Sequence, residues 1–398
     1  MARLRRFLFW GVGLALLVVV SAGAYFYFVG TRTIQQHAEA LAHQRLTVSR
    51  LADQDAYRFF FATNRVPEQP DGPIENWFSA TRDDALRFGS FDSKIEPTLG
   101  LGVLVDPDEW FVSEEIRFND VRLSSKQEVV EELRAQVEAS PRQSLLVVVH
   151  GFNTRFPSAL RKTAFLGYIL DIDTPILLFD WPANQGGSLS GYRQAREVAV
   201  DSGADLAETL RTVIEQVEPK RLWLYAHSMG GEIVARAFSE LVADASLADS
   251  QTEIEDVILA APDISRDEFN EQFKHEIKSL ARHTAVYVSS NDRALLASRL
   301  INRDARLGES SLDPTNPSQI EEAERFARLL EPGEDRLALI DVTAVNRTRN
   351  FHNFSLETPE FYDDLFLRLT TEGFPKSREL YDVEMPDGRR YFVLTEGR

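Results

Sequence analysis

From residue 144 onward, short apolar runs alternate with longer segments of helical periodicity. The apolar runs are continuous, as expected for strands that are covered on both faces of a sheet. A strand, a helix and another strand in succession imply parallel pairing with right-handed crossovers. The pattern therefore predicts an α/β fold, with a mostly parallel sheet and helices on both faces. The predicted strands are 144–149, 175–179, 221–225, 256–261, 284–288 and 336–342.

The remainder of the chain adds flanking elements to this pattern. YRFFFATNR (57–65) and GLGVLV (100–105) have the composition of early strands of the same sheet. YDVEMPDGRRYFVL (381–394) indicates a hairpin that turns at Pro386-Asp387-Gly388 and extends the domain. The predicted helices are 125–139, 158–170, 196–217, 230–245, 266–283 and 359–373.

The amino-terminal 30 residues begin with three arginines and continue as an uncharged apolar run, 7–29. As a helix this run spans roughly 34 Å, which exceeds a bilayer core of about 30 Å. Because the basic residues precede the run, we expect a single-pass anchor with a cytoplasmic N-terminus and an exported α/β domain. A cleaved signal peptide is the alternative, since Ala22-Gly23-Ala24 resembles a cleavage site. The expected organisation is anchor 1–30, polar helical stalk 31–55, α/β domain 56–372 and hairpin extension 373–398.

Composition excludes several classes of function. The net charge of −18 argues against nucleic acid as a partner, because phosphate binding needs a basic surface. The absence of cysteine excludes disulfides, cysteine-ligated zinc and a thiol nucleophile. The sequence also lacks the histidine pairs of zinc proteases and the glycine-rich loops that hold nucleotides, so we expect no metal and no cofactor.

Ser228 lies in YAHSMGG (225–231), between a predicted strand and a predicted helix. A serine on a sharp strand–turn–helix connection is the context of a nucleophile elbow. The turn is so tight that the residues two before and two after the serine must be small, and these are Ala226 and Gly230. A glycine-rich helix start is the alternative. The strand before and the helix after Ser228 favour the elbow, so Ser228 is the predicted nucleophile.

A serine nucleophile needs an imidazole within hydrogen-bond reach, and elimination among the seven histidines selects His352. In open parallel sheets, chemistry gathers where the strands end at their carboxyl edge. His352 follows the last predicted strand in a loop at that edge. His37 and His43 lie in the stalk, and His275 lies within a predicted helix. His283 lies at the opposite edge of the sheet, His227 lies beside the serine, and His150 opens HGFN.

Two carboxylates follow strands at the same edge, Asp292 and Asp263. One of them should fix the tautomer of the imidazole and stabilise the imidazolium. Asp292 is favoured because it follows the penultimate strand, while Asp263 is the alternative acid, and either aspartate suits a helix N-cap.

The backbone N–H groups of Phe152 and Met229 are the predicted oxyanion hole. Phe152 follows an early strand, and Met229 follows the nucleophile.

These stretches together resemble a known family. VVVHGFN, FDWPANQ, LYAHSMGG, LAAPD, SSNDRAL and a late histidine resemble the α/β-hydrolase superfamily. FFFATNR (59–65) is similar to a largely uncharacterised bacterial branch whose members often carry an N-terminal membrane or lipid anchor. The resemblance extends over roughly 56–370. It implies Ser228, Asp292 and His352 as a catalytic triad, and Phe152 and Met229 as oxyanion donors. It also places 180–192 beside the pocket, with Trp181 and His150 as candidate pocket-lining residues; packing in the core is the equal alternative for Trp181.

The expected function is that of a membrane-anchored serine hydrolase. It would cleave a small ester or thioester substrate through an acyl-enzyme, without a cofactor. Two alternatives stay open at this point. One is a non-catalytic scaffold or binding module of the cell envelope with the same fold, and the other is an acyltransferase that uses the same triad and excludes water.

Overall fold

The computed structural model describes residues 49–51, 56–95, 116–244, 254–309, 328–333, 335–348, 351–371 and 380–396, together with 17 and 21. The predicted anchor and stalk therefore fall almost entirely outside the described residues, and so does the predicted strand 100–105. Within the described ranges, no helix combines the length and the apolar content that crossing a bilayer requires.

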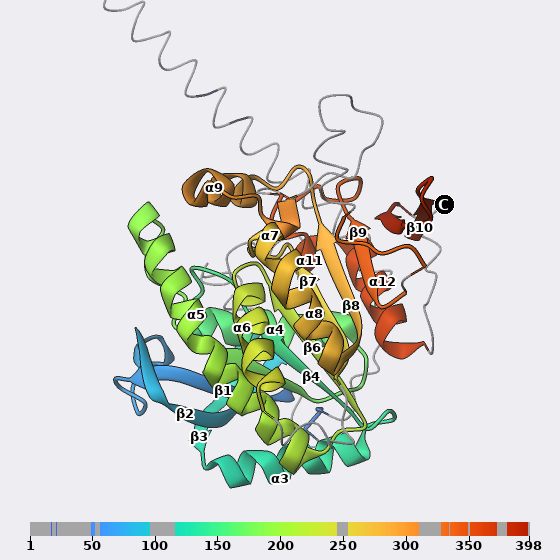
Figure 1. Cartoon of the computed structure of the whole chain (residues 1–398). Coiled ribbons are helices and arrows are strands. Elements are labelled where there is room, and N and C mark those ends of the chain that lie inside the picture. Colours follow the sequence, from blue (N-terminus) through green and yellow to red (C-terminus); the bar gives the residue numbers. More distant parts are fainter. Residues whose placement is uncertain are drawn as a thin grey trace, which may run out of the picture.

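The described strands form one 11-stranded sheet (Figure 1). In chain order they are β1 (Tyr57–Pro67), β2 (Phe78–Ile95), β3 (Ile116–Ser124), β4 (Ser144–Val149), β5 (Ile176–Asp180), β6 (Arg221–His227), β7 (Ile254–Ala260), β8 (Ala281–Val288), β9 (Leu337–Asp341), β10 (Leu380–Glu384) and β11 (Arg390–Leu394). In space their order is β10-β11-β9-β8-β7-β6-β4-β5-β1-β2-β3. All neighbours from β1 to β11 are parallel, and only the outer pairs β1–β2, β2–β3 and β10–β11 are antiparallel.

The continuous apolar runs arise because both faces of the sheet are covered. In β4, Leu145, Val147 and Val149 pack into one buried cluster, whereas Leu146 and Val148 pack into another on the opposite face. Alternate side chains of a strand point to opposite faces, so a strand inside two cores needs apolar residues at every position. The predicted mostly parallel sheet with helices on both faces is confirmed.

Helices of the described residues are distributed over the two faces (Figure 1). Side chains of α3, α5, α6 and α8 belong to one core, and those of α4, α11 and α12 belong to the other. The helix bounds are α3 (Lys126–Ala139), α4 (Phe156–Leu170), α5 (Leu189–Thr212), α6 (Gly230–Val242), α7 (Arg266–Glu268), α8 (Lys274–Leu280), α9 (Arg293–Asn302), α11 (Phe354–Glu357) and α12 (Pro359–Thr370). Shorter helical turns are η1 (Ile74–Asn76), η3 (Val213–Val217), η5 (Phe269–Phe273) and η6 (Leu307–Glu309).

The predicted helix 266–283 ends early at a strand, and two strands were not predicted. The segment 266–283 leaves the helical state at Leu280, because Ala281 and His283 pair with Ile254 and Asp256 of the neighbouring strand. The unpredicted strands β2 and β3 form the outer antiparallel part of the sheet, where half-exposed positions admit charged residues.

The carboxyl-terminal hairpin is part of the sheet. Strands β10 and β11 pair antiparallel around a turn in which Gly388 has a φ of 84°, as the sequence predicts. β11 also pairs parallel with β9, through Phe392 opposite Ile340 and Val393 opposite Asp341. The hairpin therefore continues the sheet, because it supplies the hydrogen-bonding partner of β9.

Candidate active site

The predicted site residues gather at the carboxyl edge of the parallel strands. They follow six different strands, because every crossover helix returns the chain to the opposite edge of the sheet. In order along the chain these positions are Phe152 after β4, Trp181 after β5, Ser228 after β6, Asp263 after β7, Asp292 after β8 and His352 after β9.

Ser228 occupies a tight turn between β6 and α6. Its φ of 54° lies in the left-handed region, which is unusual for serine and typical of a nucleophile elbow. The turn is held by hydrogen bonds in which Ser228 N–H donates to Ala260 O at 2.9 Å and Asp263 N–H donates to Ser228 O at 3.0 Å. A Cβ at Gly230 would lie 2.8 Å from the carbonyl oxygen of His150. The close approach of two chain segments therefore requires glycine at this position.

His352 bridges Ser228 and Asp292. Its Nε2 lies 2.8 Å from Ser228 Oγ, and its Nδ1 lies 2.7 Å from Asp292 Oδ2. In the neutral imidazole that fits both contacts, Nδ1–H donates to the carboxylate and Nε2 accepts from the serine hydroxyl. The structure thus brings together the three side chains that the sequence selected from distant segments.

Two opposing effects set the proton affinity of His352. Burial alone would lower its pKa, but the charge and hydrogen bond of Asp292, together with the charge of Asp263, outweigh burial and raise the pKa above 6.5. A raised pKa strengthens the imidazole as a proton acceptor. His227 differs from it: burial and the neighbouring His352 hold its pKa well below 6.5, and its Nε2 lies 3.2 Å from the backbone oxygen of His352.

Asp292 uses its two carboxylate oxygens for different partners. Oδ2 is bound to His352, while Oδ1 accepts from the backbone N–H groups of Ala294 and Leu295 at 3.0 Å each. Asp292 is therefore the N-cap of α9 as well as the partner of the imidazole.

Asp263 lies in a separate buried network. Its Oδ1 accepts from Arg306 Nε and Ser298 Oγ, both at 2.6 Å, and its Oδ2 accepts from Tyr192 Oη at 2.8 Å. Arg306 is fully buried and neutralises the carboxylate. Asp263 lines the cavity, but the carboxylate in contact with His352 is that of Asp292.

His150 and Trp181 do not line the cavity, which corrects the expectation from the sequence. Trp181 is fully buried, its indole N–H donates to His150 O at 2.8 Å, and its ring stacks on the imidazole at a centroid distance of 5.7 Å. The ring nitrogens of His150 lie 3.0 Å from Asp180 Oδ1 and 3.0 Å from Gly151 O. These buried contacts turn both side chains away from the cavity.

The predicted oxyanion donors occupy two turns beside Ser228. Phe152 follows β4 and lines the cavity, while Met229 is the residue at the N-cap of α6. Neither backbone N–H donates to a backbone acceptor in the described part of the chain. Phe152 lies in a turn and Met229 at the start of a helix, where backbone N–H groups are suited to hold a negatively charged oxygen.

A cavity of about 460 Å³ opens over Ser228 and His352. Its wall is largely apolar and includes Phe152, Leu189 and Ile301 from three different elements. Lys162 and Asp263 also line the cavity, and Asp263 is paired with Arg306, so it is the apolar part of the wall that suits an apolar group. Among the described residues, no group of three or more His, Asp or Glu side chains is placed to hold a metal ion.

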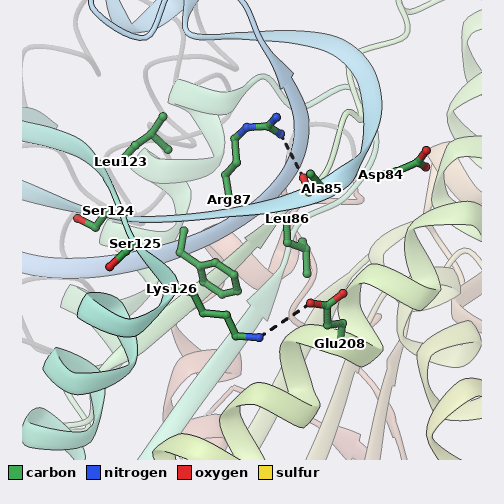
Figure 2. A pocket seen from close by; sticks show the side chains of 10 residues that line it. Asp84, Ala85, Leu86, Arg87, Leu123, Ser124, Ser125, Lys126 and Glu208 are labelled. Carbon is green, nitrogen blue, oxygen red and sulfur yellow. Dashed lines mark hydrogen bonds and ion pairs between the residues drawn. The ribbon is translucent and has the colours of Figure 1, made fainter.

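A second hollow, of about 440 Å³, lies where β2 and β3 meet α3 and α5 (Figure 2). Its charged groups pair locally: Lys126 Nζ lies 3.9 Å from Glu208 Oε1, and Arg87 Nη1 donates to Ala85 O at 3.1 Å. None of the predicted site residues lines it.

Two buried charges beneath the site were not identified as functional candidates from the sequence. Arg65 Nε donates to Asp180 Oδ2 at 2.7 Å, and neither side chain is more than 1% exposed. The only sequence signal was positional: Arg65 ends the FFFATNR motif and Asp180 begins DWPANQ, each at the end of an apolar strand. Their pairing across 115 positions is visible only in the fold.

Comparison with known proteins gives a family and two similar structures. The family described as "Alpha/beta hydrolase of unknown function (DUF900)" matches residues 125–366, more than half of the chain. No curated protein matches. A putative hydrolase from Agrobacterium vitis S4 is 14% identical over 73% of this chain and 94% of its own, with a TM-score of 0.32. A butyrate-bound thermophilic esterase, Est2, from Thermogutta terrifontis is 14% identical over 59% of this chain and 86% of its own, with a TM-score of 0.29.

Proposed function

The chain belongs to the alpha/beta hydrolases of unknown function (DUF900), and from this premise we propose that it is a serine hydrolase of ester-type bonds. The observation that carries the proposal is the pair of contacts made by His352, at 2.8 Å to Ser228 Oγ and 2.7 Å to Asp292 Oδ2. A serine hydroxyl bound to an imidazole that is itself oriented by a carboxylate is the arrangement that activates serine as a nucleophile.

In the proposed reaction, Ser228 Oγ attacks the acyl carbon while its proton passes to Nε2 of His352. The electron pair of the carbonyl π bond moves to the oxygen, which then accepts hydrogen bonds from the N–H groups of Phe152 and Met229. The tetrahedral intermediate collapses, the bond to the leaving alcohol breaks, and His352 returns the proton to that alcohol. Asp292 stabilises the transient imidazolium. Water then repeats the sequence on the acyl-enzyme and releases the acid.

The cavity wall supports a substrate with an apolar acyl group. Leu189, Leu295 and Ile301 line the same cavity as Ser228. Burying a methylene group is favourable by about 0.8 kcal/mol, so each added carbon of the acyl chain should tighten binding until the cavity is full. We therefore expect kcat/KM on p-nitrophenyl esters to rise with chain length and then fall.

A fluorophosphonate probe tests the nucleophile directly. The wild-type protein should be labelled and hydrolyse p-nitrophenyl esters, while Ser228→Ala should do neither. Ser298→Ala is the matched control, because Ser298 lines the same cavity and its hydroxyl contacts Asp263 rather than His352. Labelling of Ser228→Ala, or its loss in a folded Ser298→Ala protein, would contradict the assignment. Product analysis with an added alcohol distinguishes hydrolysis from acyl transfer.

We further propose that the domain is held at a membrane by residues 1–30. The support is the sequence: an uncharged apolar run preceded by arginines. Full-length protein should stay in the membrane fraction after alkaline extraction, and residues 56–398 should be released. N-terminal sequencing of the mature protein is the second measurement, since a start near Tyr25 would show a cleaved signal peptide instead.

A further inference from the structure

Arg65 has more polar contacts than its own ion pair requires. Its guanidinium binds both oxygens of Asp180, at 2.7 and 3.2 Å. It also donates to the backbone oxygens of Thr154, at 3.0 Å, and Trp181. A further bond runs from Nη1 to Asn184 Oδ1 at 2.6 Å. One buried side chain therefore joins the end of β1 to the loops that follow β4 and β5.

The loop after β4 is the one that carries the N–H of Phe152. On one side of Phe152, His150 O accepts from the indole N–H of Trp181 at 2.8 Å. On the other side, Asn153 N–H donates to Ala183 O at 3.0 Å, and Thr154 O accepts from Arg65. Asn153 lies in a turn and has a φ of 54°, in the left-handed region. With its neighbours bound to the residues after β5, the orientation of the Phe152 peptide is determined by those contacts.

We infer that Arg65, held in place by Asp180, is a positioning residue for the oxyanion hole. The inference rests on the proposed function, because it concerns the Phe152 N–H that would bind the oxyanion. Arg65 does not reach the cavity, so its effect passes through the backbone of Thr154 and Trp181.

The chemistry of arginine explains why this residue suits the position. A planar guanidinium presents several donors in fixed directions, so it binds a carboxylate and separate carbonyl oxygens at the same time. A lysine ammonium preserves the charge beside Asp180 but cannot reproduce that set of directions. Buried Asp180 keeps its negative charge because Arg65 and His150 outweigh its burial and hold its pKa below 3.8. Arg65→Lys therefore separates the positioning role from the charge.

The experiment compares two arginines of β1. Arg65→Lys is the test variant. Arg58→Lys is the matched control, since Arg58 lies near the other end of the same strand and binds both oxygens of Asp92, at 2.7 and 2.8 Å. A second test variant, Arg65→Met with Asp180→Asn, removes both charges and leaves no ion buried without a partner. Active sites are counted by fluorophosphonate labelling, and kcat, KM and inhibition by an alkyl boronic acid are measured for each protein.

For both Arg65 variants we expect kcat per labelled site to fall roughly 10- to 100-fold, with KM changed by less than about threefold. The boronic acid should bind more weakly by a similar factor, because its tetrahedral adduct uses the oxyanion hole. Arg58→Lys should match the wild type. A purely structural role would lower the melting temperature or the labelled fraction and leave kcat per labelled site unchanged, and that result overturns the inference. If wild-type Ser228 is not labelled, the proposed function fails and the inference fails with it.

Discussion

Two histidine–aspartate pairs lie at the same edge of the sheet, and only one of the two imidazoles also contacts a serine hydroxyl. His352 Nδ1 lies 2.7 Å from Asp292 Oδ2, and His150 Nε2 lies 3.0 Å from Asp180 Oδ1. The remaining ring nitrogen of His352 contacts the hydroxyl of Ser228, whereas that of His150 contacts the backbone oxygen of Gly151. The pairs therefore differ less in their own geometry than in what lies beyond the imidazole.

The neighbouring charges also separate the two pairs. Burial lowers the pKa of His150 below 6.5; Asp180 offsets this only in part, and the cation of Arg65 lowers the pKa further. For His352, burial and the cation of Lys162 act in the same direction, but the charge and hydrogen bond of Asp292, together with the charge of Asp263, outweigh both and raise the pKa above 6.5. A carboxylate beside a histidine is thus insufficient by itself to raise the pKa of the imidazole, because burial and a neighbouring cation oppose it.

Replacing the two imidazoles should give the largest difference. His352→Gln removes the proton acceptor, so we expect kcat for ester hydrolysis to fall about 10⁵- to 10⁶-fold. His150→Gln retains a polar side chain in a buried position and should cost less than about 100-fold. Both are measured on p-nitrophenyl esters at equal concentrations of folded protein. Losses of equal size would show that the two pairs are not functionally distinct.

The two aspartates that line or adjoin the cavity should differ next. Asp292→Asn retains an oxygen that caps α9 but presents an amide to Nδ1, which selects the wrong tautomer and should lower kcat about 10⁴-fold. Asp263→Asn should lower kcat by no more than about tenfold, and its main cost is stability, about 3 kcal/mol, because Arg306 loses its buried partner. Ester hydrolysis and thermal melts measure the two effects. A larger kcat loss for Asp263→Asn would identify Asp263 as the acid.

The pH dependence of kcat/KM should follow His352 alone. The base must be neutral, so activity should fall about tenfold per pH unit below its pKa, which lies above 6.5. In Asp292→Asn this fall of activity on the acid side (the acid limb) should begin at a lower pH, because the anion that raises the pKa of His352 is gone. His150→Gln should leave the limb in place. An acid limb that moves with His150 and not with Asp292 would contradict the comparison.

The smallest expected effects are on stability, and they have opposite signs. The pKa of His150 is lowered on folding, so protons favour the unfolded chain. The contribution of neutral His150 to the unfolding free energy is therefore lost as the pH falls below the unfolded pKa of 6.5. The pKa of His352 is raised, so its contribution is present below 6.5 and lost as the pH rises through the folded pKa. In urea melts from pH 5 to 8, His150→Gln should reduce the rise of unfolding free energy with pH below 6.5. His352→Gln should remove a fall of the unfolding free energy with pH above 6.5. If the two variants changed the pH dependence with the same sign, the assignment would be contradicted.

The sequence predicts those parts of the molecule that have a local cause. Continuous apolar runs predict strands such as Ser144–Val149, because burial on both faces leaves no polar position. Ser228 is predictable because a strand and a helix flank it directly, and His352 follows from its position after the last long apolar run. The antiparallel strands β2 and β3 escape prediction, since their half-exposed, charged residues resemble loop sequence.

The interactions that escape prediction join distant positions. Arg65 and Asp180 each resemble an ordinary charged residue at a strand end, and only the parallel pairing of β1 with β5 brings them together. The resemblance makes Trp181 a candidate pocket-lining residue because it lies in the stretch 180–192. Its burial depends on a hydrogen bond to the backbone of His150, which no sequence pattern encodes.

The two oxygens of Asp292 link the width of the cavity to the orientation of the base. Oδ1 holds the first turn of α9, and side chains of that same helix, Leu295 and Ile301 among them, form part of the cavity wall. A ligand too bulky for the cavity would displace α9 and shift the carboxylate that aligns the imidazole. Engineering a wider specificity through α9 should therefore lower turnover even when every triad residue is kept, whereas enlarging the wall formed by Leu189 leaves this helix start untouched.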